Sequence, residues 1–240
     1  MASNTSILRR TSDRNLFLAA AIAYPLLVFV GYFKTYYFSA FFDVKPIANA
    51  LVHAHGIVMS LWVVYFTVQV VLIRSKNIKL HMTLGIAGIL LAALVIIIGF
   101  ATAWDSHIVR ATAPGGVHPH SFFIVPVVNM ALFIVFFAGA IYFRKRPAEH
   151  KTLMLLTALN FLPAAIGRIP VPIPPKLAIF WTYGVSDLIA ITCLIWYTIK
   201  YRKLNKIFAL GVLLLLISQP LRVYFAFTET WLLFVGWIAS

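Results

Sequence analysis

The chain has 240 residues, of which 62% are hydrophobic and only 11% are charged. So few charges, with a mean hydropathy of +0.94, exclude an ordinary water-soluble domain and indicate a membrane protein. The net charge is +14, from 20 lysines and arginines against 6 acidic residues. Because most basic residues fall in short loops between apolar stretches, membrane topology explains this charge, and no nucleic-acid partner is expected.

Seven apolar stretches follow one another along the chain, each about long enough to cross a bilayer as a helix. After a polar segment over residues 1–14, they cover residues 15–37, 48–73, 81–103, 120–143, 151–168, 177–199 and 206–227. The predicted fold is all-α: a polytopic membrane protein with seven transmembrane helices. Residues 15–240 are expected to form a single transmembrane domain with the lipid bilayer as its main partner.

Basic residues predict the orientation of these spans, since short cytoplasmic loops carry an excess of lysine and arginine. Fourteen of the 20 basic residues lie in residues 1–14 and in the loops that follow the second, fourth and sixth spans. We therefore expect residues 1–14 to be a cytoplasmic segment, with the N-terminus inside and the C-terminus outside. The expected location is the bacterial cytoplasmic (inner) membrane.

Four histidines occupy matching places in the four middle spans. His55 and His120 lie near the expected outer ends of the second and fourth spans, and His81 and His150 begin the third and fifth spans at the inner face. Both inner histidines are followed by x-Thr-Leu. Residues 48–168 are therefore expected to form a central four-helix bundle made of two hairpin repeats in parallel orientation.

Paired histidines on facing helices can bind haem iron from both sides. The pairs His55 with His120 and His81 with His150 would hold one or two b-type haems, and Arg168 could neutralise a haem propionate. At 1.5 Å per residue, His55 lies about 27 Å and His120 about 33 Å from the inner ends of their helices, so the outer pair fits one iron less easily. A bis-histidine iron has no open position, which favours electron transfer to a redox partner or quinol.

These four histidines and the basic inner loops resemble the transmembrane ascorbate-reducible diheme cytochromes b over residues 48–168. The resemblance implies a four-helix core in which histidine pairs on alternate helices hold two haems. The chain has seven predicted spans where those cytochromes have six, and it lacks their substrate-side motifs, so electron transfer is implied without ascorbate as donor. The His-Lys-x-Leu-Met run at residues 150–154 is also similar to one in a group of bacterial membrane proteins of unassigned function.

A second hypothesis is a metal site at the outer face. Five potential ligands are expected there: His55, Asp105, His107, His118 and His120. Nitrogen and carboxylate ligands suit zinc, copper or non-haem iron. Such a site could activate water or oxygen, which would make the protein a membrane hydrolase or oxidoreductase.

A third hypothesis is a transporter, a sensor or an accessory membrane subunit. Asp187 lies near the middle of the sixth predicted span and Arg222 near the outer end of the seventh. Ionisable side chains within a bilayer are candidates for function. A direct Asp187–Arg222 ion pair would instead satisfy both charges without any transport role.

Overall fold

The computed structural model describes residues 2–240, with side chains from residue 15 onward, and these residues form helices and turns but no strands. The α-helices are α1 (Ala2–Tyr32), α2 (Ala50–Arg74), α3 (Ile78–Trp104), α4 (Pro119–Tyr142), α5 (Pro147–Leu159), α6 (Leu162–Ile166), α7 (Val185–Tyr201), α8 (Lys206–Ala226) and α9 (Glu229–Ala239). Short 3-10 and π turns cover Phe33–Tyr37, Ser39–Phe41, Asp105–Val109, Pro114–Gly116, Pro175–Leu177 and Phe180–Gly184. The all-α prediction is confirmed.

Six helical segments are long and apolar enough to cross a membrane. They are Asn15–Tyr37, Ala50–Arg74, Ile78–Val109, Pro119–Tyr142, Pro175–Tyr201 and Lys206–Ala226. They match six of the seven predicted spans. The third begins three residues earlier than predicted, at Ile78, and extends to Val109 because a π turn continues α3. The chain is therefore a polytopic, helical integral membrane protein.

The remaining predicted span, over residues 151–168, is a broken helix. The 13-residue α5 ends at Leu159, and α6 adds only five residues after the interruption at Asn160 and Phe161. Pro163 accounts for the break, because a proline has no N–H to donate to the carbonyl of Leu159 four residues earlier. Neither piece alone has the length of a membrane-crossing helix.

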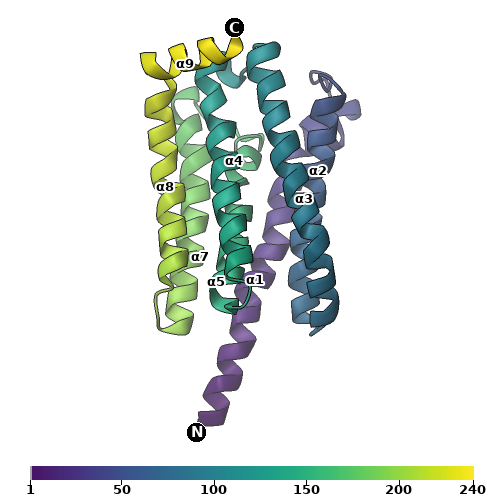
Figure 1. Ribbon diagram of the computed structural model, residues 1–240, viewed down its shortest axis with the longest axis vertical. Helices are drawn as coiled ribbons and strands as arrows, with labels where there is room; N and C mark the ends of the chain where they lie inside the picture. The colour runs from purple at the N-terminus through teal and green to yellow at the C-terminus, as the bar shows by residue number, and fades with distance from the viewer. Residues whose placement is uncertain (1) are drawn as a thin grey trace.

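The turns between α2 and α3, α4 and α5, and α7 and α8 lie at the same end of the bundle, which is also the end where α1 begins (Figure 1). We call this the basic end, because these turns and their flanking residues carry Arg74, Lys76, Lys79, Arg144, Lys145, Arg146, Lys151, Lys200, Arg202, Lys203 and Lys206. The C-terminus lies at the opposite end (Figure 1). The basic loops thus gather on one side, as the sequence predicted.

The C-terminal helix α9 was not predicted from the sequence. It lies across the end of the bundle opposite the basic end, roughly perpendicular to the long helices (Figure 1). The indole nitrogen of Trp231 donates a hydrogen bond to the carbonyl of His120 at 2.9 Å, and Val235 is completely buried. With 11 residues, α9 is too short to cross a membrane and covers the start of α4 instead.

Aromatic packing joins the two central hairpins, α2–α3 and α4–α5. Trp62 of α2 and Phe133 of α4 are both completely buried, and their ring centroids are 5.0 Å apart in an edge-to-face arrangement. Such a contact adds to the free energy gained by burying the two rings. It fixes the two hairpins against each other between the two ends of the bundle.

Candidate functional site

Two of the predicted histidines meet at the basic end. His81 is the fourth residue of α3 and His150 is the fourth residue of α5. Their ring centroids are 6.4 Å apart and their planes are at 83°. Both side chains are half-buried. The inner pair expected from the sequence is therefore brought together by the fold.

Local sequence signals fix where these two helices begin. The Asn77 side chain accepts a hydrogen bond from the backbone N–H of Leu80 at 3.2 Å, which caps α3. Pro147 is the first residue of α5, where its missing N–H costs nothing. As a result, each histidine lies in the first turn of its helix at a defined height above the basic turn.

The preceding helix of each hairpin supplies a backbone carbonyl to its histidine. Nδ1 of His150 is 2.8 Å from the carbonyl oxygen of Ala140 on α4. The carbonyl of Gln69 on α2 lies beside the His81 ring in the corresponding place, although Nδ1 of His81 makes no hydrogen bond with any described residue. Each histidine therefore lies beside a backbone carbonyl of the preceding helix, but only His150 bonds to it, and the hairpin repeat stays a prediction.

The geometry of the inner pair fits a bis-histidine iron. Two imidazoles bound to opposite faces of one iron, with bonds of about 2 Å, have ring centres about 6 Å apart, close to the observed separation. The Nδ1 of His150 is engaged with a carbonyl, which leaves Nε2 as the nitrogen available to a metal. The unpartnered, buried Nδ1 of His81 shows that this ring still lacks part of its hydrogen bonding.

The predicted outer pair is arranged differently. The His120 ring packs against His118, with centroids 5.2 Å apart, and the described side chains show no ring contact between His55 and His120. His55 instead lies within the electrostatic reach of Arg168. The Arg168 guanidinium donates to the carbonyl of Ala164 at 2.6 Å and stands over the Tyr32 ring.

The predicted outer metal ligands have other partners. The Asp105 carboxylate accepts hydrogen bonds from Arg110 at 2.7 Å and from Asn49 at 3.0 Å. Nδ1 of His107 lies 2.6 Å from the carbonyl of Thr112. Among the residues whose side chains are described, no group of three or more His, Cys, Asp or Glu is placed to hold a metal ion. The outer metal site stays a prediction from the sequence.

A second polar cluster lies inside the bundle, around Arg222. Its guanidinium, only 3% exposed, donates to the side-chain oxygen of Asn129 at 2.6 Å and to the Ser218 carbonyl and hydroxyl oxygens. The Asn160 amide, at the break between α5 and α6, donates to the Asn129 carbonyl at 2.8 Å. We call Asn129, Asn160, Asp187, Ser218, Gln219 and Arg222 the arginine network.

Asp187 joins this network through an amide and not through a direct ion pair. Its carboxylate accepts a hydrogen bond from Gln219 at 2.8 Å. In the described part of the chain the single ion pair is Asp105 with Arg110, so Asp187 and Arg222 do not form the contact pair considered from the sequence. Each charge has neutral partners instead, which spreads the cost of burial over several hydrogen bonds.

Sequence reasoning missed the amides that make up these clusters: Gln69, Asn129, Asn160 and Gln219. Gln69, Asn160 and Gln219 are more than nine-tenths buried, and Asn129 bonds to the buried Arg222. The signal available was their position, since a carboxamide within an apolar span needs a partner on a neighbouring helix. The sequence prediction considered only histidines and charged residues, so it did not include these four amides.

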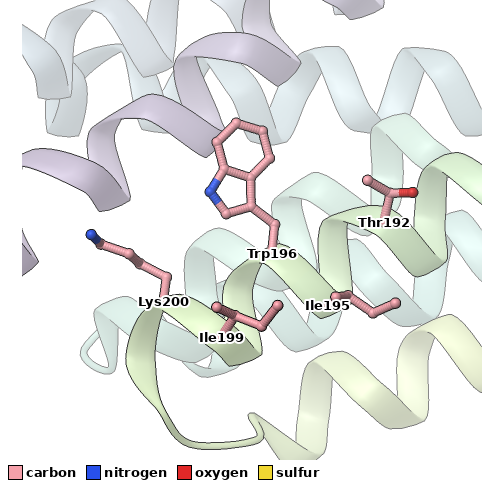
Figure 2. Close-up of a pocket in the computed structure, with 5 residues that line it drawn as sticks. All are labelled: Thr192, Ile195, Trp196, Ile199 and Lys200. Carbon is pink, nitrogen blue, oxygen red and sulfur yellow. The ribbon is translucent and has the colours of Figure 1, made fainter.

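A shallow groove of about 410 Å³ runs along α7 and is lined by Thr192, Ile195, Trp196, Ile199 and Lys200 (Figure 2). All five residues come from this one helix, and Ile195, Trp196 and Ile199 are exposed. In a membrane this surface meets lipid. None of the predicted site residues lines it, so we do not assign a function to the groove.

The fold and the histidines together define a polytopic helical membrane protein with a pair of imidazoles at its basic end. Comparison with protein-family models, with curated proteins and with solved structures gave no significant match.

Proposed function

We propose that this protein is an electron-transfer protein of the membrane that holds a b-type haem between His81 and His150. The observation that carries the proposal is the approach of the two rings to a centroid distance of 6.4 Å, from two different helices, at one end of the bundle. A lone membrane histidine is commonly a helix contact. Two that face each other at this spacing suit opposite coordination of one iron.

The chain's own residues would orient the ligands. Bonded to the Ala140 carbonyl, Nδ1 of His150 would carry the proton, which would leave Nε2 free to bind the iron. His81 and His150 would both hold the haem, which would supply one-electron redox chemistry and leave no place at the iron for a substrate. An iron that no substrate can reach favours electron transfer over chemistry at the metal. The protein would exchange these electrons with a redox partner or a quinol.

The outer histidines are a separate part of the proposal. A second haem at His55 and His120 would need these side chains to face each other, and His120 now packs on His118. The nearby Arg168 would suit a propionate there. The geometry favours a single haem at the basic end, and the zinc, copper or iron site at the outer face remains the alternative.

For the topology we propose seven crossings, with the broken α5–α6 segment as the fifth. The N-terminal end of α1 and the C-terminus lie at opposite ends of the bundle, which favours an odd number of crossings (Figure 1). The positive-inside rule then puts the basic end in the cytoplasm of a bacterial cell. Reporter fusions at the two termini should report opposite sides of the inner membrane; the same side for both would contradict this topology.

The absorption spectrum of the detergent-purified protein, oxidised and reduced, tests the function directly. We expect Soret and alpha bands of low-spin haem, with about one haem per chain. A colourless protein with stoichiometric zinc or copper would overturn the haem proposal and favour the outer metal site. A colourless protein without metal would overturn both and leave transport, sensing or an accessory role.

A further inference from the structure

The two histidines of the inner pair differ in one respect. Nδ1 of His150 is engaged with the Ala140 carbonyl, whereas Nδ1 of His81 is buried and, in the described part of the chain, has no hydrogen-bond partner. A histidine that binds a metal through one nitrogen carries its proton on the other, and that N–H needs an acceptor. The backbone carbonyl of Gln69 lies beside the His81 ring without making this hydrogen bond, so no described group yet fixes the orientation of the ring.

A candidate for that acceptor lies beside it on α2. Gln69 is 7% exposed, and neither Oε1 nor Nε2 of its carboxamide has a hydrogen-bond partner among the described residues. Its backbone carbonyl lies next to the His81 ring, so the two residues are neighbours. An unsatisfied buried amide inside a membrane protein is costly, because no water is present to replace the missing partners.

Tyr65, one helical turn before Gln69, completes the arrangement. Its hydroxyl lies beside the Gln69 amide and donates to the carbonyl of Leu84 on α3 at 3.3 Å. Gly88 leaves room for this hydroxyl, since a Cβ at residue 88 would overlap it. The Tyr65 oxygen can still accept a hydrogen bond, and the Gln69 Nε2 group has hydrogens to donate.

We propose that Gln69 is the positioning residue of His81. With the cofactor bound, Nδ1–H of His81 donates to Oε1 of Gln69, Nε2–H of Gln69 donates to the Tyr65 oxygen, and the Tyr65 hydroxyl keeps its hydrogen bond to Leu84. This chain gives every unpartnered polar atom of His81 and Gln69 a complementary partner. It also fixes the tautomer of His81, leaving Nε2 directed at the metal as in His150.

The inference rests on the proposed function, because it assigns Gln69 a role toward the same haem. Partners that accept a hydrogen bond from a ligating histidine raise the basicity of that ligand and lower the reduction potential of the metal. The Gln69 amide should also change the thermal stability of the haem-loaded and haem-free forms in opposite directions. Its carboxamide has no hydrogen-bond partner in the haem-free protein and would have partners in the haem-loaded protein.

The experiment compares Q69L and Q69E with the parent in haem content, midpoint potential and thermal unfolding of both the haem-loaded and the haem-free protein. For Q69L we expect roughly 10–100-fold weaker haem retention and a higher potential. Its haem-free form should unfold at the parent's temperature or roughly 2–4 °C above it. Q69E keeps an acceptor oxygen, so it should retain haem and shift the potential downward.

Gln219 offers a matched control, since it is the only other glutamine in the chain and is also buried, but it bonds to Asp187. Q219L should destabilise both forms without moving the potential. Haem bands in the parent with unchanged potential and haem retention in Q69L and Q69E would overturn the role of Gln69 and leave the haem proposal standing. A parent without haem would overturn the proposed function, and this inference with it.

Discussion

The two polar clusters inside the bundle contain similar side chains but differ in how many of their polar atoms have hydrogen-bond partners. The guanidinium of Arg222 donates through all three of its nitrogens, to Asn129 and Ser218. In the other cluster, which we call the histidine cluster (Tyr65, Gln69, His81 and His150), the Gln69 carboxamide and Nδ1 of His81 have no hydrogen-bond partners among the described residues. Both clusters are buried among apolar helices, so the same energetic rules apply to each.

This difference supports the binding role that we propose for one of the two clusters. Hydrogen bonds of the arginine network come from α4, α7, α8 and the break after α5, so it ties the helices of one half of the bundle together. Of its described buried side-chain atoms, only the Asn160 oxygen has no hydrogen-bond partner. The histidine cluster leaves more of its buried polar atoms without partners. We therefore assign a structural role to the arginine network and propose a binding role for the histidine cluster.

The largest effect is expected where the arginine network loses the acceptor of a buried charge. N129L removes the side-chain oxygen that accepts a hydrogen bond from the Arg222 guanidinium. This change should lower the free energy of unfolding by about 3–5 kcal/mol. Denaturation in detergent micelles measures this change in the free energy of unfolding. The double variant N129L/R222M removes the charge as well and should recover part of the loss. If the double variant is worse than N129L alone, Arg222 has a stabilising role beyond this contact.

A smaller effect is expected from Ser218, whose hydroxyl oxygen lies 2.7 Å from the Arg222 guanidinium. S218A leaves one N–H of the guanidinium without this acceptor and should cost about 1–3 kcal/mol. Haem content should remain that of the parent, because the network and the histidine pair are separate. Loss of haem at unchanged stability in S218A would contradict the division of the two clusters.

The smallest effect is expected at the end of the bundle opposite the basic end. The side chains of Arg110 and Asp105 are 28% and 20% exposed, so solvent weakens their ion pair. D105A should change the free energy of unfolding by less than about 1 kcal/mol, with no change in haem or metal content. A bound metal that disappears in D105A would restore the outer metal site as the leading hypothesis.

Much of the fold follows from the sequence because membrane-crossing helices are determined by length and apolarity. Six predicted spans, and the gathering of the basic loops at one end, agree with the structure. The break after Leu159 was less predictable, since a proline within a membrane helix can also be accommodated by a kink. Helix α9 is short and apolar, and its position depends on tertiary contacts such as that of Trp231 with His120.

The site was predictable to a smaller extent. The spacing of His81 and His150 from the basic turns placed both at one membrane face, and the structure brings their rings together. The rotation of each helix about its axis, however, decides which polar residues meet. The helices are apolar on every side, so their sequences contain no marked polar face that would fix this rotation. The surroundings of Gln69, Asn129 and Arg222 therefore became clear only from the packed structure.

The central claim is that His81 and His150 bind one cofactor together, and spectra of single variants test it most directly. Reduced-minus-oxidised spectra and haem content of H81A and H150A should be measured beside the parent and beside H118A, which removes an exposed histidine. We predict that H81A and H150A each abolish the same low-spin component, since loss of either axial ligand disrupts a bis-histidine site, and that H118A retains it. Unchanged spectra in both H81A and H150A would contradict the account.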